Sequence, residues 1–117
     1  MIDHTGIGVA DVGRSAAFYD AVLGALDLGR VMELRENEGT DGIGYGVDYP
    51  IFWIDRFHPH SVRQHVAFAA NSRAEVETFH AAALRAGAPT MEHRACARGA
   101  TRPGITQPSC WIRTATT

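Results

Sequence analysis

The sequence has few cysteines, little net charge and no long apolar run, and each shortage excludes a class of protein. Its two cysteines, Cys96 and Cys110, do not form a CxxC motif, so we expect no disulfide framework and a cytoplasmic location. No apolar run approaches the ~20 residues of a bilayer span, and the first residues do not resemble a secretory signal. The formal net charge of -2 gives no reason to expect nucleic acid or an anionic membrane as a partner.

What the sequence does contain is a short segment written twice, 61 positions apart. His4 begins an alternating run in the first copy, and His65 begins a similar run in the second. A polar break and an amphipathic helix follow in both copies, so that Phe18 corresponds to Phe79. A repeat of this kind indicates two similar structural modules, each with a histidine at the start of its first strand.

The spacing of apolar residues predicts the elements of both copies. Helices are expected from a cap at Asp11 or Ser15 to about Gly24, and at residues 74–85 after Ser72. Alternation predicts five strands, at residues 2–9, 30–35, 43–47, 51–57 and 64–70.

These elements divide a single domain into two modules. The order β-α-β-β-β describes a first module at residues 1–57, which a hinge at 58–63 joins to a second module at 64–117. His58 and His60 flank a proline in the hinge, and we expect a solvated loop there. The second module begins by repeating the strand and helix of the first.

The two modules resemble the vicinal oxygen chelate superfamily, which includes glyoxalases, bleomycin resistance proteins and extradiol dioxygenases. The resemblance implies an α+β fold of paired βαβββ modules whose sheets curl around a cleft, and it implies a homodimer. It covers about residues 1–87. Three phrases carry it: Ile-Asp-His-Thr-Gly-Ile at 2–7, Arg-Ser-Ala-Ala-Phe-Tyr-Asp-Ala-Val-Leu-Gly at 14–24 and Gln-His-Val-Ala-Phe-Ala at 64–69.

The end of the chain departs from this pattern. Residues 88–117 show no sustained alternation and no acidic residue after Glu92. Members of the family end instead with a phrase such as Phe-Val-x-Asp-Pro-Asp-Gly-Asn-x-Ile-Glu, whose glutamate is a metal ligand in the metal-dependent members. We therefore expect the second module to be incomplete or irregular after residue 87.

A shift of the reading frame accounts for this departure. If codons are started on the third base of each codon, Cys110-Trp111-Ile112 can only encode Leu-Asp, and Met91-Glu92 can only encode Gly. With permitted codons the following residues read Pro-Asp-Gly-Asn, so the shifted frame gives the phrase of the family. Our hypothesis is that residues 88–117 are frameshifted.

The resemblance implies that His4 and His65 are metal ligands on the first strands of the two modules. Imidazole suits divalent Fe, Mn, Ni or Zn, and two histidines with one carboxylate form a facial triad with open positions. Such a metal acts as a Lewis acid on an oxygen-chelating substrate, which predicts a lyase or a dioxygenase. Two departures oppose this prediction: Trp53 stands where glyoxalases place a carboxylate, and the last glutamate is missing. No general base is identified.

A second hypothesis is a metal-free protein that binds and sequesters a small hydrophobic compound, with no cofactor. Aromatic residues of the predicted strands are candidates to line its cleft, although aromatic residues in strands more often belong to the core. These candidates are Tyr45, Phe52, Trp53 and Phe57. Both hypotheses predict a small-molecule ligand.

Overall fold

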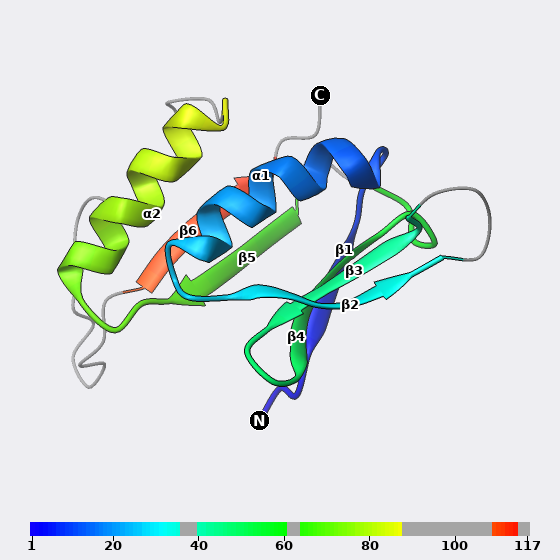
Figure 1. The fold of residues 1–117 in the computed structure, drawn as a ribbon, viewed down its shortest axis with the longest axis horizontal. Helices are drawn as coiled ribbons and strands as arrows, with labels where there is room; N and C mark the ends of the chain where they lie inside the picture. The colour runs from blue at the N-terminus through cyan, green and yellow to red at the C-terminus, as the bar shows by residue number, and fades with distance from the viewer. Residues whose placement is uncertain (36–39, 61–63, 88–108, 115–117) are drawn as a thin grey trace.

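The computed structural model describes residues 1–35, 40–60, 64–87 and 109–114 of the chain (Figure 1). They form a four-stranded sheet, a two-stranded sheet and two helices, which is the expected α+β class. The elements are β1 (Thr5–Gly8), α1 (Val12–Gly24), β2 (Gly29–Leu34), β3 (Gly42–Gly46), β4 (Pro50–Asp55), β5 (Gln64–Ala69), α2 (Arg73–Arg85) and β6 (Ser109–Thr114). Neither helix of this part of the chain is long and apolar enough to cross a membrane.

The first module has the predicted order β-α-β-β-β. Its strands lie in the order β1-β4-β3-β2, with β1 parallel to β4 and the other neighbours antiparallel. β1 is shorter than the predicted strand at residues 2–9. β2 is an edge strand with a register shift between Arg30 and Met32, and none of its side chains is fully buried. The alternation of its sequence therefore does not correspond to one buried and one exposed face.

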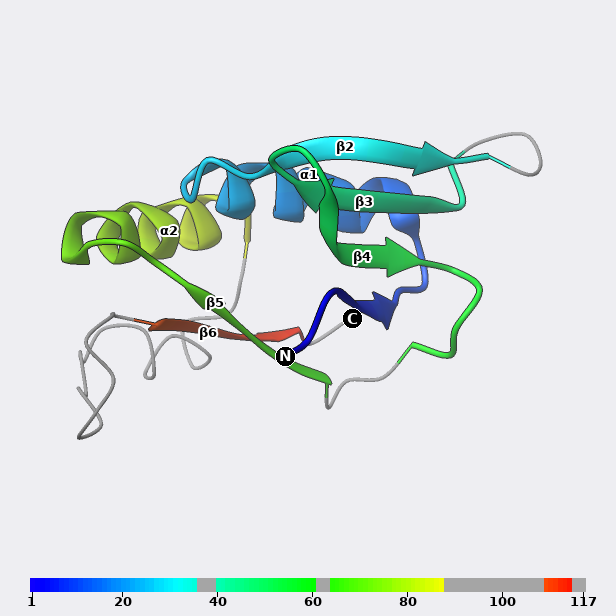
Figure 2. The same ribbon diagram turned by 90° about the horizontal axis from the view of Figure 1, so that it is seen from below.

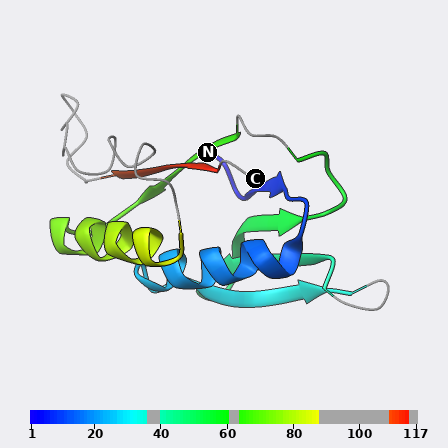
Figure 3. The same cartoon turned by 90° about the horizontal axis from the view of Figure 1, so that it is seen from above.

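Helix α1 covers one face of the four-stranded sheet (Figure 3). Asp11 is its N-cap, and its side chain accepts a hydrogen bond from the backbone N–H of Arg14 at 3.0 Å. The other predicted cap, Ser15, lies inside the helix. The buried side chains of α1 recur at helical spacing and face the sheet. They are Val12, Ala16, Tyr19, Val22 and Leu23.

A continuous aromatic core joins the two modules. The ring centroids of Tyr19 in α1 and Phe52 in β4 are 5.2 Å apart, and those of Phe52 and Phe68 in β5 are 5.0 Å apart. Phe68 in turn lies 6.3 Å from Phe79 in α2. The two helices also contact each other and occupy one layer of the molecule (Figure 2). The modules therefore share one core, although their sheets are separate.

The second module starts as the repeat predicts. Ser72 caps α2 by accepting from the backbone N–H of Glu75 at 3.2 Å, and the Glu75 carboxylate accepts from the backbone N–H of Asn71 at 2.7 Å. After residue 87 the described part of the chain contains one strand, β6, which is antiparallel to β5. In the first module the neighbour of β1 is parallel, so β6 does not take the equivalent place. The rest of 88–117, to which the frameshift hypothesis applies, lies outside the described residues.

Candidate functional site

The four-stranded sheet has one face under α1 and one face directed away from it. Side chains alternate between the two faces along each strand. Tyr45 of β3 and Phe52 of β4 face α1, since both rings contact Tyr19 of that helix. We call the opposite face the open face. On β4 it carries the side chains that alternate with Phe52, which are Ile51, Trp53 and Asp55. On β2 it carries Met32 and Leu34, which lie on the same side of the sheet.

The open face is largely apolar and exposed. Met32 is 48% exposed, Leu34 39% and Ile51 42%, whereas Trp53 is half-buried. Single exposed apolar residues are common, but a contiguous group on one sheet face is typical of a ligand or partner site. This face is therefore our candidate functional site.

Glycines shape the open face around Trp53. A Cβ atom at Gly44 would lie 2.9 Å from Cζ2 and 3.0 Å from Cε2 of the Trp53 ring. A Cβ at Gly6, across from Trp53 on β1, would lie 3.1 Å from its Cβ. Glycine at position 44 thus lets the indole lie against the backbone of β3.

The loop after β4 bounds the open face at the far end of β1. A side chain at Gly8 would overlap with the carbonyl oxygens of His58 and Pro59, so this loop passes directly over Gly8. The nearly buried Asp55 holds the loop, because its Oδ1 accepts from the backbone N–H groups of Phe57 and His58 at 3.0 Å each. The ring Nδ1 of His58 also lies 2.9 Å from this oxygen.

His4 lies just before β1, and its side chain is about half exposed (54%). Its Nδ1 is 2.7 Å from Oδ2 of Asp3, and the hydroxyl of Tyr49 donates to the same oxygen at 3.1 Å. These hydrogen bonds, the one from His4 first, hold the pKa of Asp3 below its ordinary value, and Asp3 raises the pKa of Tyr49. A carboxylate that engages one ring nitrogen leaves the other, Nε2, for a metal.

The second predicted ligand, His65, lies on β5, but its side chain is outside the described part of the structure. Among the described side chains, no three His, Cys, Asp or Glu residues come together in a group that could hold a metal ion. The described donors therefore fit a metal only in part: Asp3 engages Nδ1 of His4, and the remaining ligands would have to come from residues that are not described.

The structure separates the four aromatic residues that were candidates for a cleft. Tyr45 and Phe52 are 0% and 1% exposed and belong to the core under α1, which was the alternative reading, so they are not accessible from the open face. Trp53 lies on the open face, and Phe57 is exposed in the loop after β4. Only Trp53 is placed where a ligand on the open face would contact it.

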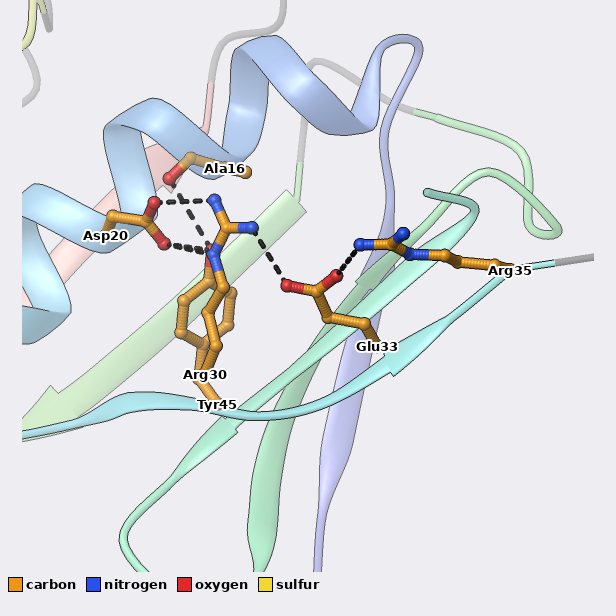
Figure 4. A network of polar contacts seen from close by, with 6 residues as sticks. All are labelled: Ala16, Asp20, Arg30, Glu33, Arg35 and Tyr45. Atoms are coloured by element: carbon orange, nitrogen blue, oxygen red, sulfur yellow. Dashed lines mark hydrogen bonds and ion pairs between the residues drawn. The ribbon is translucent and has the colours of Figure 1, made fainter. Parts of the chain in front are cut away.

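A polar network on the α1 side of the sheet had no signal in the sequence (Figure 4). Arg30 of β2 donates to both oxygens of Asp20 in α1, at 2.9 and 2.6 Å, and the hydroxyl of Tyr45 donates to Asp20 at 2.9 Å. Glu33 accepts from Arg30 at 3.2 Å and from Arg35 at 2.9 Å. Burial raises the pKa of Tyr45, so its hydroxyl stays protonated as a donor. The network fixes the edge strand β2 to α1.

No family model matches the chain, and no curated protein matches it. Among solved structures, the chain is similar to a glyoxalase/bleomycin resistance protein from Albidiferax ferrireducens T118. The two are 30% identical over 73% of this chain and 68% of that one, with a TM-score of 0.52. The likeness therefore extends over more than two thirds of each chain.

Proposed function

Because the chain belongs to the glyoxalase/bleomycin resistance protein superfamily, we propose that it binds a small, planar, apolar compound on its open face without a metal. The observation that carries this proposal is the indole of Trp53, which lies on the glycine-lined open face. By the family resemblance, Trp53 stands where glyoxalases place a carboxylate. An aromatic surface there favours stacking of a ligand over coordination of a metal.

The surroundings of Trp53 suit such a ligand. Offset stacking of two aromatic rings contributes about 0.5–1.5 kcal/mol beyond the area that is buried. Met32, Leu34 and Ile51 add apolar surface around the indole. Small-molecule sites are mostly apolar with a few polar groups, and this face has that composition.

We also propose that the protein is a cytoplasmic homodimer. Ligand sites usually bury most of the ligand, whereas the open face is exposed in the single chain. A second copy of the chain is the cover that the family resemblance implies. Light scattering coupled to size-exclusion chromatography measures this directly, and a monomeric mass at micromolar concentration contradicts the dimer.

Binding to Trp53 is tested with N-phenyl-1-naphthylamine, a neutral aromatic dye whose emission rises in apolar surroundings. We expect saturable binding with energy transfer from tryptophan, and an affinity about three- to tenfold lower in Trp53→Ala because the stacking surface is lost. Val47→Ala is the control, since Val47 is 68% exposed in the turn between β3 and β4. Equal affinities of the wild type and Trp53→Ala contradict the proposal.

A second candidate function is a metal-dependent lyase or dioxygenase. The observation in its favour is the contact of His4 with Asp3, which leaves Nε2 of His4 for a metal. In this reading His4 and His65 hold Fe, Mn, Ni or Zn, and the metal would supply Lewis-acid chemistry to an oxygen-chelating substrate.

Metal analysis of the purified protein decides between the two candidates. Stoichiometric metal in the wild type that is lost in His4→Ala favours the enzyme. Less than a tenth of an equivalent after loading and gel filtration, unchanged in His4→Ala, favours the metal-free binding protein.

A further inference from the structure

We propose that His58, oriented by Asp55, selects ligands of the open face that carry a hydrogen-bond donor, such as a hydroxyl or N–H group. This inference rests on the proposed binding function and names the chemical class of the ligand. In the sequence, His58 was expected only to be a solvated loop residue.

The Asp55 carboxylate orients the ring of His58. Its Nδ1 lies 2.9 Å from Oδ1 and 3.1 Å from Oδ2 of Asp55, and an ionised carboxylate only accepts hydrogen bonds. Nδ1 therefore carries the proton. In the neutral ring the other nitrogen, Nε2, then has a free lone pair and acts as an acceptor.

The loop after β4 holds the His58 ring in this orientation. The Asp55 side chain is only 12% exposed, whereas that of His58 is 73% exposed. Asp55 also accepts from the backbone N–H groups of Phe57 and His58, so the carboxylate and the loop backbone fix each other. The imidazole is thus held at its inner nitrogen and presents its outer edge to solvent.

Asp55, which holds the His58 ring, lies near Trp53 on the open face. Asp55 is two residues after Trp53 on β4, so both side chains leave the sheet on the open face, ~7 Å apart along the strand. A Cβ at Gly42 would lie 3.5 Å from Cβ of Asp55, which confirms this side. The backbone of His58 passes over Gly8 at the end of the same face. A two-ring aromatic compound stacked on Trp53 spans the distance to Asp55, whose carboxylate holds the His58 ring.

The Trp53 ring and the Nε2 acceptor of His58 together suit a planar apolar compound with a hydrogen-bond donor at one end. The apolar part contacts Trp53, and the donor reaches Nε2 of His58. The negative charge of Asp55 behind the imidazole disfavours an anionic group at that end, so we expect a neutral hydroxyl or N–H.

The test compares 2-naphthol with 2-methoxynaphthalene, which keeps the rings and the oxygen but has no donor. By isothermal titration calorimetry we expect the wild type to bind 2-naphthol about three- to tenfold more tightly, which corresponds to one hydrogen bond. His58→Ala should abolish the preference, because the affinity for 2-naphthol should fall to that for 2-methoxynaphthalene. His60→Ala, a substitution of the neighbouring exposed histidine, is the matched control and should keep the preference.

A second measurement does not depend on a variant. In the wild type, ¹⁵N NMR of the His58 ring should show a shift at Nε2 on addition of 2-naphthol and none with 2-methoxynaphthalene. Equal affinities for the two compounds, both weakened by Trp53→Ala, overturn the role of His58 and leave the stacking site intact. If neither compound binds, or if Trp53→Ala does not change the affinity for either compound, the proposed function fails together with the inference.

Discussion

Gly44 shows how a single missing side chain positions the candidate site. Its hydrogen atoms face the Trp53 ring and Cβ of Pro50, which a Cβ at position 44 would approach to 2.6 Å. Glycine is thus needed here for close approach, and not for an unusual backbone angle. The same position in the sequence reads only as one of several glycines in a strand.

Gly44→Ala should therefore destabilise the protein and displace the Trp53 ring. Forcing a methyl group into packed surroundings costs about 1–3 kcal/mol. Urea denaturation measures this cost, and tryptophan emission reports the displacement. Gly24→Ala is the control, because a Cβ there meets nothing within 4 Å. A stability of Gly44→Ala equal to that of the control would contradict the close packing.

Asp20 makes the free energy of unfolding depend on pH. Its hydrogen bonds, first from Arg30 and then from Tyr45, hold the pKa of Asp20 below the ordinary value of 3.8. A carboxyl group whose pKa is lower in the folded state stabilises the fold above the unfolded pKa, and this stabilisation is lost as the pH falls through the folded pKa. The contribution should be full at pH 7, should begin to fall near pH 4 and should be lost only below the lowered folded pKa.

Asp20→Asn tests this dependence. At pH 7 the variant should unfold at a lower urea concentration than the wild type, by less than ~1 kcal/mol, because the Arg30 pair is partly exposed and screened by water. At pH 3 the difference should shrink. A difference that is constant between pH 7 and pH 3 would show that the Asp20 carboxylate is not responsible.

At the scale of elements, α1 shows what the sequence allows one to predict. Helical spacing located it, and two cap residues were compatible with its start, since both Asp11 and Ser15 are good N-caps. The structure selects Asp11. The strands β1, β3, β4 and β5 were also located to within a few residues, although β3 is buried along its whole length and does not alternate in burial.

Substitution of the two cap candidates separates them in solution. Asp11→Ala should cost about 1 kcal/mol, because the backbone N–H of Arg14 loses its acceptor. Ser15→Ala should be neutral or slightly stabilising, since alanine favours a helix interior. Thermal or urea unfolding checks both, and the reverse order of stabilities would place the start of the helix at Ser15.

The features that the sequence did not predict depend on contacts between distant elements. Nothing in the spacing of Asp20 and Arg30, or of Trp53 and Gly44, indicates that they meet. Likewise, the sequence left Tyr45 and Phe52 with two readings, because alternation gives the two faces of a strand but not which one a helix covers. The sequence therefore named Trp53 among four candidates for a ligand cleft but did not predict which of the four lies on the open face.

At the scale of the whole molecule, the frameshift hypothesis makes a prediction about the gene. Sequencing around codons 86–88 should find one base more, or two bases fewer, than the displayed frame requires. The protein made from the natural gene should then have an intact mass other than 12.7 kDa. Independent clones and a protein mass that agree with the displayed frame would exclude a sequencing error and would leave a true lesion of the gene.

The aromatic contacts between Tyr19, Phe52, Phe68 and Phe79 have a consequence for how the molecule unfolds. Each half supplies rings that the other half buries, so neither half keeps a complete core when the other opens. The internal repeat therefore does not behave as two independent folding units. We therefore expect loss of structure in one half to expose Phe52 or Phe68 in the other, and the two halves to melt in a single cooperative transition.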